Sequence, residues 1–299
     1  MSQLTTPAAA VPAAPAKVGN RPGRSRRSPV KSLLLHGTLV IASLIALGPI
    51  VWVLLASFKP GYAVQSSELT LVKDPTLANY SYVLFDTNFP RWLLNSVIVA
   101  AFTMLIGIFF SATTGYAVSR FNFPGRRPLM MTFLITQMFP AAILIVPIYT
   151  IMARLGLINT LPALVIAYLT IAVPFCAWML KGYFDSIPTS LDEAAALDGC
   201  GPFAIFWRVV LPLARPAIAV TAFYTFLTAW GEVMYASAFI QTDDTFTLAY
   251  GLQQFVPQFN PQWEYLTAAA VLVTVPAGVV FMIAQRHLVS GLTAGGTKG

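Results

Sequence analysis

Long stretches without a charged residue constrain the fold of this chain more than any other feature. Five stretches contain no Asp, Glu, Lys or Arg, and a sixth, residues 216–242, contains only Glu232. The five are residues 32–58, 92–119, 128–153, 155–180 and 265–285. Each is long enough for the roughly 20 apolar residues that cross a bilayer, where only helices satisfy their own backbone. The sequence therefore predicts an all-α polytopic membrane protein with six spans.

The overall composition supports this class. Only 10% of the residues are charged, whereas a typical soluble domain has about 25%. The net charge of +7 would suit a nucleic-acid-binding protein, but the positive residues gather at the ends of the apolar stretches. That distribution is typical of membrane topology. We therefore expect the lipid bilayer as a partner, and no nucleic acid.

The positions of Lys and Arg predict the orientation. With a cytosolic N-terminus, 14 of the 18 Lys and Arg residues lie on the cytosolic side and 4 lie outside. Cytoplasmic segments carry the excess of these residues in membrane proteins. Both termini, and the polar segment 188–212 between the fourth and fifth spans, are therefore expected in the cytosol.

The first 31 residues are rich in Ala and Pro and then basic, a composition that cannot form a packed core. We interpret residues 1–31 as a disordered cytosolic tail. A signal peptide is the alternative, because a basic region precedes an apolar one. Residues 32–58 are too long for a signal sequence and lack a clear cleavage site, which favours a first transmembrane helix.

The polar segment 188–212 contains signals for helices and is not a simple linker. Ser190 followed by Glu193 matches a capping box, and Asp192 and Glu193 place negative charge where a helix N-terminus favours it. An alanine-rich run continues this helix, and Gly199 supplies a left-handed residue to end it.

A second short helix should follow in the same segment. Pro202 suits its first residue, and Pro212 is expected to close it. Two short helices joined by a glycine turn indicate a docking element. The alternative is an ordinary amphipathic loop at the membrane surface.

The same segment resembles a known family. Its motif reads Glu193-Ala194-Ala195, then Gly199, then Val209-x-Leu211-Pro212. It resembles the "EAA…G…I-LP" loop of ABC-importer permeases, with Val209 where the family usually has Ile. In that family the loop is a coupling helix that sits in a cleft of a cytosolic ATPase. The resemblance therefore implies that Glu193, Ala194, Ala195, Gly199, Leu211 and Pro212 form an ATPase-coupling loop.

Two further stretches resemble the MalG branch of this family, which serves maltose and maltodextrin importers. They are residues 284–290 with the Gly-rich ending that follows, and residues 247–255. The similarity runs from about residue 90 to residue 299, whereas the first span matches only in character. Residues 1–31 find no counterpart.

The resemblance implies a MetI-like permease fold and an importer with several subunits. The partners would be a second, MalF-type permease, a dimer of MalK-type ATPase subunits and an extracytoplasmic sugar-binding protein. This chain would bind no cofactor, and the partner ATPase would use ATP and Mg²⁺. The importer would lie in a bacterial or archaeal cytoplasmic membrane.

The implied domain organisation follows the spans. A permease core of five helices would occupy residues 92–290, with a cytosolic coupling loop at 185–215 and an outside loop at 241–264. Residues 291–299 would form a cytosolic tail.

The resemblance also assigns roles to the last two segments. The tail, with Gly295, Gly296 and Lys298, would reach into the interface of the ATPase dimer. The outside loop would face the binding protein and help displace sugar through four residues: Gln253, Gln254, Phe255 and Trp263. Aromatic faces and amides suit sugar, but the same composition suits an aromatic belt at the outer membrane surface.

Glu232 is the one carboxylate predicted inside a span. Because a carboxylate facing lipid is costly, it should face the bundle interior, the transport pathway or a partner helix. It is either a pathway residue or a hydrogen-bonded structural residue near the outer helix end. Asn95, Gln137 and Tyr168 pose a similar choice, in which packing through interhelical hydrogen bonds is favoured.

The sequence offers no catalytic site. It contains no phosphate-binding G-x-x-x-x-G-K-[ST] motif, and no Ser/His/Asp or H-E-x-x-H constellation. Cys176 and Cys200 should lie at different depths, and His36 and His287 lie near opposite chain ends. We therefore predict no disulfide, no metal site and no enzyme activity in this chain.

These observations predict a permease subunit that forms half of a translocation pathway for maltose or related α-glucosides. A permease for another sugar or a polyol is the alternative within the family. An ATP-independent secondary transporter is the alternative from another class, but this alternative does not explain the 188–212 segment. The sequence does not determine the sugar.

Overall fold

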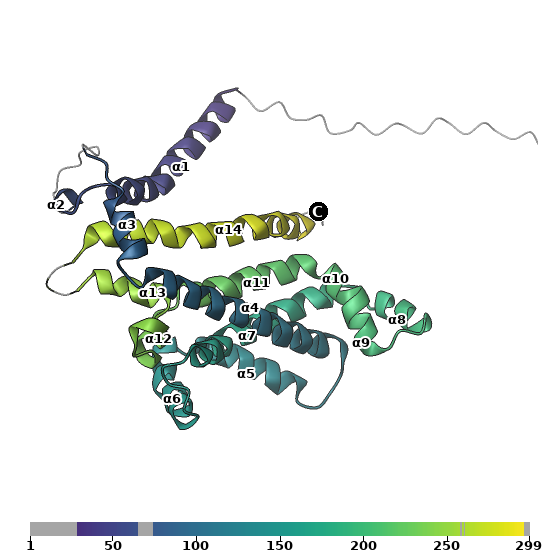
Figure 1. Ribbon diagram of the computed structural model, residues 1–299. Coiled ribbons are helices and arrows are strands. Elements are labelled where there is room, and N and C mark those ends of the chain that lie inside the picture. The colour runs from purple at the N-terminus through teal and green to yellow at the C-terminus, as the bar shows by residue number, and fades with distance from the viewer. Residues whose placement is uncertain (1–28, 65–73, 258, 260, 296–299) are drawn as a thin grey trace, which may run out of the picture. The chain divides into compact units, whose positions relative to one another are not determined.

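The computed structural model describes residues 29–64, 74–257, 259 and 261–295 (Figure 1). The predicted tail at 1–31 therefore lies almost wholly outside the described residues. Throughout the described ranges the chain forms helices and connecting loops, and no strand. This agrees with the all-α class that the sequence predicts.

The longer helices are α1 (Pro29–Ser57), α4 (Phe89–Arg120), α5 (Arg126–Met138), α6 (Ala141–Arg154), α7 (Leu161–Ser186), α11 (Arg215–Trp230) and α14 (Trp263–Gly295). Shorter ones connect them: α2 (Gly61–Val64), α3 (Ala78–Phe85), α8 (Ser190–Leu197), α9 (Pro202–Ile205), η1 (Phe206–Val210), α10 (Leu211–Leu213), α12 (Met234–Phe239), η2 (Asp243–Thr245), α13 (Leu248–Gly251) and η3 (Leu252–Phe255).

The N-terminal part of α1, up to Ile50, belongs to a unit separate from the rest of the chain. It is apolar around its whole circumference, and its large side chains are exposed. A helix of this kind is suited to lipid. The stretch 32–58, predicted as the first span, forms part of one continuous apolar helix that ends at Ser57.

Within the described residues, four helices are long and apolar enough to cross a membrane: α1, α4, α7 and α14. The predicted span at 128–153 is instead split into α5 and α6, which bend by 110°. The break has a local cause, because a residue before proline avoids the helical conformation. Phe139 is extended, with φ −79° and ψ 131°, immediately before Pro140.

The predicted span at 216–242 is also interrupted. The helix α11 ends at Trp230, and a new helix, α12, begins at Met234. Glu232 lies in the break, so the expectation that it sits inside a spanning helix is wrong. Counting the bent pairs α5–α6 and α9–α11 as one span each gives at most six spans.

The helices α4, α7 and α11 pack against one another in the body formed by residues 51–295. Small residues allow a close approach. A Cβ added at Gly115 of α4 would lie 3.1 Å from the Ala177 carbonyl oxygen and 3.1 Å from the Lys181 backbone nitrogen of α7. Small residues at such crossings are typical of membrane helices, which lack a hydrophobic drive to associate.

Two clusters of buried side chains form the core, one at each end of these helices. The larger one contains Trp92, Tyr168, Trp230 and Tyr235, and we call it the outer-end cluster. The smaller one contains Tyr116, Phe184, Phe206 and Val210, and we call it the loop-end cluster. In Figure 1, α8 to α10 lie at one end of α4, α7 and α11, and α12 and α13 lie at the other.

The segment between α12 and α14, residues 240–262, is tied to the start of α4, and we call it the outer loop. The Asn95 amide donates hydrogen bonds to the carbonyl oxygens of Asp244 and Phe246, at 2.8 and 2.9 Å. The Ser96 hydroxyl accepts one from the Leu248 N–H at 2.7 Å. These bonds satisfy backbone groups of a segment with little regular structure of its own.

The last helix is longer than predicted. A tail was expected from residue 291, whereas α14 continues to Gly295. Residues 296–299 lie outside the described residues.

Candidate functional site

The segment 188–212 folds into two short helical stretches joined by a turn, and we call it the docking loop. Its first helix is α8, and its N-cap is Thr189. The backbone N–H groups of Asp192 and Glu193 donate to the Thr189 carbonyl oxygen, at 2.9 and 3.1 Å. The predicted capping box at Ser190 is absent, because the chain already has helical angles at Thr189 and Ser190 lies within the helix.

The end of α8 follows the sequence prediction. Gly199 has φ +86°, a left-handed conformation that suits glycine. The Gly199 N–H donates to the Ala196 carbonyl oxygen, and the Cys200 N–H donates to the Ala195 carbonyl oxygen at 2.9 Å. This pair of bonds is a Schellman motif, which satisfies the last carbonyl groups of the helix.

The second stretch begins at Pro202, as predicted, but Pro212 does not end it. The chain passes from α9 into a π-helical turn, in which the Leu211 N–H donates to the Phe206 carbonyl oxygen. Pro212 has no N–H to donate, and the wider turn before it accommodates this loss. The stretch ends at Ala214, where the chain bends by 81° into α11.

An ion pair joins the docking loop to the end of α4. The Arg120 Nε atom lies 2.6 Å from the Asp192 Oδ2 atom, and the two side chains are only 8% and 17% exposed. A second Arg120 nitrogen, Nη2, donates to the Ile187 carbonyl oxygen at 3.0 Å. Sequence reasoning gave Asp192 only a role at a helix N-terminus. It missed Arg120, which is distant in the chain.

Apolar contacts complete the attachment. Ala195 of α8, and Phe206 and Val210 of the π-helical turn, are buried in the loop-end cluster. The Phe206 ring centre lies 4.8 Å from that of Tyr116 on α4. The inner face of the docking loop is therefore fixed by burial, and its outer face is free.

The outer face carries large apolar side chains in an exposed position. Leu197 is 90% exposed and Phe203 is 83% exposed. Glu193 and Ala194 of the motif are exposed as well, whereas Leu211 and Pro212 are half-buried. An exposed group of apolar side chains next to polar ones is typical of an interaction surface.

Glu232 has a structural role in the break between α11 and α12. Its carboxylate accepts hydrogen bonds from the backbone N–H groups of Tyr235 and Ala236, at 2.9 and 3.3 Å. These are the first N–H groups of a new helix, which have no partner within that helix. The carboxylate therefore helps to start α12.

The other polar residues singled out in the spans differ in burial, since Asn95 and Tyr168 are buried and Gln137 is exposed. Asn95 binds backbone carbonyl groups of the outer loop, as described above. The Gln137 side chain of α5 donates to the Ile171 carbonyl oxygen of α7 at 3.1 Å. Tyr168 is fully buried in the outer-end cluster. The hydrogen bonds of Asn95 and Gln137 confirm the favoured packing role for these two residues.

The residues in and next to the outer loop that were predicted to face a binding protein differ in exposure. Gln253 and Gln254 are exposed, and Trp263 is 41% exposed. Phe255 is only 3% exposed, and its ring centre lies 6.1 Å from that of Trp92. Phe255 is thus a core residue, and the expectation that it lies on the surface is wrong, because the loop turns its ring inward.

The remaining predicted residues are the tail residues and the two cysteines. Gly295 is the last residue of α14, and Gly296 and Lys298 lie outside the described residues. Cys176 is a buried free cysteine and Cys200 is a half-buried one. Among the residues that the structure describes, no three His, Cys, Asp or Glu side chains gather in a way that suits a metal ion.

Comparison with known proteins identifies the family. Residues 104–294 match the model of the "binding-protein-dependent transport system inner membrane component" family. This match includes the docking loop and most of the helical body. The chain belongs to this family of membrane permeases. The family membership excludes the alternative of an ATP-independent secondary transporter.

Individual relatives are sugar permeases. The chain is 36% identical to the maltodextrin permease MalD of Streptococcus pneumoniae, over 87% of this chain and 93% of MalD. It is 44% identical to the maltose/maltodextrin permease MalG of Salmonella typhimurium, over 70% of this chain and 72% of MalG. It is also 33% identical to the galactooligosaccharide permease GanQ of Bacillus subtilis, over 90% and 96%.

The fold has a counterpart among solved structures. A chain of a bacterial ABC transporter that imports alginate superposes with a TM-score of 0.77, covering 90% of this chain and all of that one. The two sequences are 24% identical. This likeness supports the fold of an ABC-importer permease and the MetI-like class predicted from the sequence.

Proposed function

We propose that this chain is the MalG-type permease subunit of an ATP-driven importer for maltose or maltodextrin. It forms half of the translocation pathway with a second permease of the MalF type. Its docking loop binds one of two cytosolic ATPase subunits of the MalK type, and its outer loop faces an extracytoplasmic sugar-binding protein. The importer lies in a cytoplasmic membrane, with both ends of this chain in the cytosol.

The observation that carries this proposal is the construction of the docking loop. One face is buried in the loop-end cluster and joined to α4 through Arg120, while the opposite face exposes Leu197 and Phe203. A loop that is fixed to the spans on one side can transmit a movement of whatever binds its other side. The mechanism requires such an element, because two sites are coupled only when both bias the same conformational change.

ATP and Mg²⁺ enter this mechanism through the partner. The chain has no phosphate-binding loop, so hydrolysis belongs to the ATPase subunits and this chain holds no cofactor. Closure of the ATPase dimer would move the docking loop together with the end of α4. The spans would then expose the pathway alternately to the two sides of the membrane.

The similar permeases do not all serve the same sugar. MalD and MalG are maltodextrin and maltose/maltodextrin permeases by name, whereas GanQ serves galactooligosaccharides at a comparable identity. A permease for another oligosaccharide is therefore the second candidate.

The test is to purify the tagged chain from its native membrane in mild detergent and to identify its stoichiometric partners. We expect an ATPase and a second permease. ATP hydrolysis by this complex should rise when the binding protein is loaded with maltose or maltotriose, and not when it is loaded with a galactooligosaccharide. The reverse preference would support the second candidate. A chain that purifies alone and transports without ATP would contradict the proposal.

A further inference from the structure

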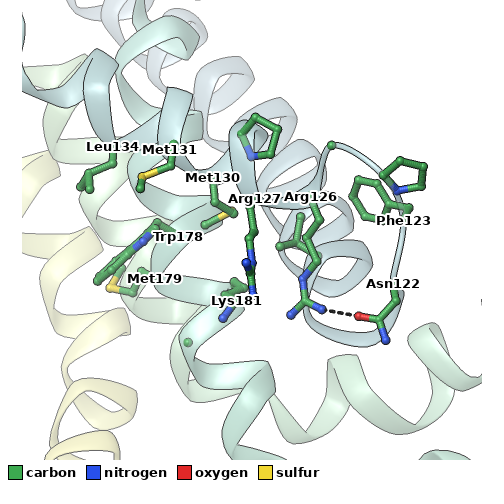
Figure 2. A pocket seen from close by; sticks show the side chains of 15 residues that line it. Asn122, Phe123, Arg126, Arg127, Met130, Met131, Leu134, Trp178, Met179 and Lys181 are labelled. Atoms are coloured by element: carbon green, nitrogen blue, oxygen red, sulfur yellow. Dashed lines mark hydrogen bonds between the residues drawn. The ribbon is translucent and has the colours of Figure 1, made fainter.

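A large groove lies at the same end of the body as the docking loop. It has a volume of about 1200 Å³ and is bounded by the turn after α4, the first half of α5 and the last part of α7. Figure 2 shows three cationic side chains in it, Arg126, Arg127 and Lys181. We call this feature the basic groove.

The cations of the groove keep an excess of positive charge. Lys181 is paired with Asp185, with 2.5 Å between the Nζ and Oδ2 atoms. Arg126 donates to the neutral amide oxygen of Asn122 at 2.8 Å. Arg127 is exposed and makes no ion pair with the described residues. Among the described residues, no Asp or Glu lines the groove. Asp185 is the one carboxylate that forms an ion pair with any of the three cations.

The other part of the groove is apolar. In Figure 2, the side chains of Met131, Leu134 and Trp178 gather to one side of the cations. Each is exposed: Met131 by 61%, Leu134 by 48% and Trp178 by 55%. A tryptophan beside basic residues at the end of a spanning helix is typical of the boundary between headgroups and acyl chains.

One wall of the groove contains a glycine with open space beside it. Gly182 of α7 lines it, and a Cβ added there would meet no heavy atom within 4 Å. A larger side chain at this position would therefore occupy the groove without a clash against the helix neighbours. This property supplies a test that leaves the charges unchanged.

We propose that the basic groove binds an anionic phospholipid. The headgroup phosphate lies against Arg126, Arg127 and Lys181, and an acyl chain runs along Met131, Leu134 and Trp178. Charge complementarity favours this occupant, since basic pockets between membrane helices on the cytoplasmic side bind anionic headgroups. A neutral lipid would satisfy the apolar part and leave the excess cations without a partner.

The site is next to the attachment of the docking loop. Asp185, which pairs with Lys181, also accepts a hydrogen bond from the Ser119 hydroxyl at 2.7 Å. Ser119 directly precedes Arg120, whose side chain holds Asp192 of the docking loop. The placement in the cytosolic leaflet rests on the proposed function, whereas the preference for anionic lipid does not.

The experiment counts lipids on the protein as it is purified. The tagged chain, with whatever co-purifies, is placed in nanodiscs of phosphatidylcholine with a minor fraction of phosphatidylglycerol. It is then re-extracted in mild detergent, and the retained lipids are identified by native mass spectrometry. We expect phosphatidylglycerol to be enriched over phosphatidylcholine. The double variant Arg126→Gln/Arg127→Gln should reduce this enrichment by roughly 30-fold, at the usual contribution of a basic residue near a membrane surface.

Two further variants make the result specific. Arg154→Gln removes an exposed cation at the end of α6, away from the groove, and should leave the enrichment unchanged. Gly182→Leu keeps every charge but fills the groove, and should abolish the enrichment.

Equal retention of the two lipids by the wild-type chain would overturn the proposal, as would an unchanged enrichment in the double variant. If Gly182→Leu instead reduces co-purification of the second permease and leaves the lipids unchanged, a protein helix occupies the groove and the proposal is wrong. A chain that purifies alone would count against the proposed function, and its retained lipids would still test the groove.

Discussion

The docking loop and the outer loop are both attached to α4, but by different physical means. At the start of α4, Asn95 and Ser96 form directional hydrogen bonds to the backbone of the outer loop. At its end, Arg120 forms one ion pair and one hydrogen bond, and the docking loop is otherwise held by burial of apolar side chains. One helix therefore connects the two loops that face opposite partners in the proposed importer.

The difference indicates which attachment can change during transport. Several hydrogen bonds to backbone groups fix a loop in one arrangement, since each lost bond leaves a buried polar group unsatisfied. An apolar contact tolerates small shifts, because its attraction is not directional. We therefore expect the outer loop to move as one body with α4, and the docking loop to make small shifts against the loop-end cluster while the Arg120–Asp192 contact keeps it attached to α4.

The largest effect should follow from breaking that contact. Arg120→Gln leaves Asp192 largely buried without a counterion, which typically costs about 3 kcal/mol or more. ATP-driven uptake in membrane vesicles should then fall at least tenfold, because the docking loop is no longer fixed to the span.

The control is the double variant Arg120→Gln/Asp192→Asn. It removes both charges and should recover part of the uptake and of the thermal stability. Strictly additive losses would show that the two side chains do not interact.

A change on the exposed face of the docking loop should act on the partner alone. Glu193→Lys reverses a charge that has no role in the attachment to α4 or in the loop-end cluster. We expect the ATPase to co-purify at least about tenfold less, since opposing a charge across an interface typically costs several kcal/mol. The thermal stability of the chain should stay constant. Unchanged ATP-driven uptake would argue against this face as the contact.

A smaller effect is expected at the outer loop. Asn95→Ala removes the donor of two hydrogen bonds and leaves the buried carbonyl group of Phe246 without this partner, at a cost of about 1–3 kcal/mol. Hydrogen exchange should increase at residues 244–248 and remain constant in the docking loop. Thr113→Ala is the matched control on α4, because its exposed hydroxyl bonds only to its own helix. Faster exchange in both loops would mean that they are not held independently.

The smallest effect on folding is expected from Glu232→Gln. The amide keeps an oxygen that can accept the N–H of Tyr235, so α12 should still form and the importer should assemble. We nevertheless expect slower transport, because the negative charge is lost from a break between two helices of the body. Wild-type uptake by this variant would leave Glu232 with its structural role alone.

The sequence predicted the spans well where a single physical rule applied. Charge-free stretches correspond to the continuous helices α1, α4, α7 and α14, because lipid excludes charges and favours helices. The same rule missed the breaks, since the run 128–153 contains Pro140 and the run 216–242 contains Gly231 at the point of interruption. No pattern in the sequence indicated that the run 128–153 would bend by 110°.

For the docking loop, the sequence predicted where helix α8 ends but not where it begins. Gly199 and Pro202 act as their backbone preferences dictate. The capping box failed because the N-cap lies one position earlier than predicted, at Thr189, so that α8 already begins at Ser190. The Arg120–Asp192 ion pair and the burial of Phe255 depend on contacts between distant segments, which a pattern within one segment does not contain.

The most direct test of the account is a photo-crosslink from the exposed face of the docking loop. A benzophenone amino acid replaces Leu197 in one variant of the assembled importer. In the other variant it replaces Phe259, which lies in the outer loop and is 93% exposed. We predict that position 197 forms an adduct with the ATPase subunit, and that position 259 forms one only with the sugar-binding protein. No ATPase adduct from position 197, or an equal yield from position 259, would contradict the assignment of the docking loop.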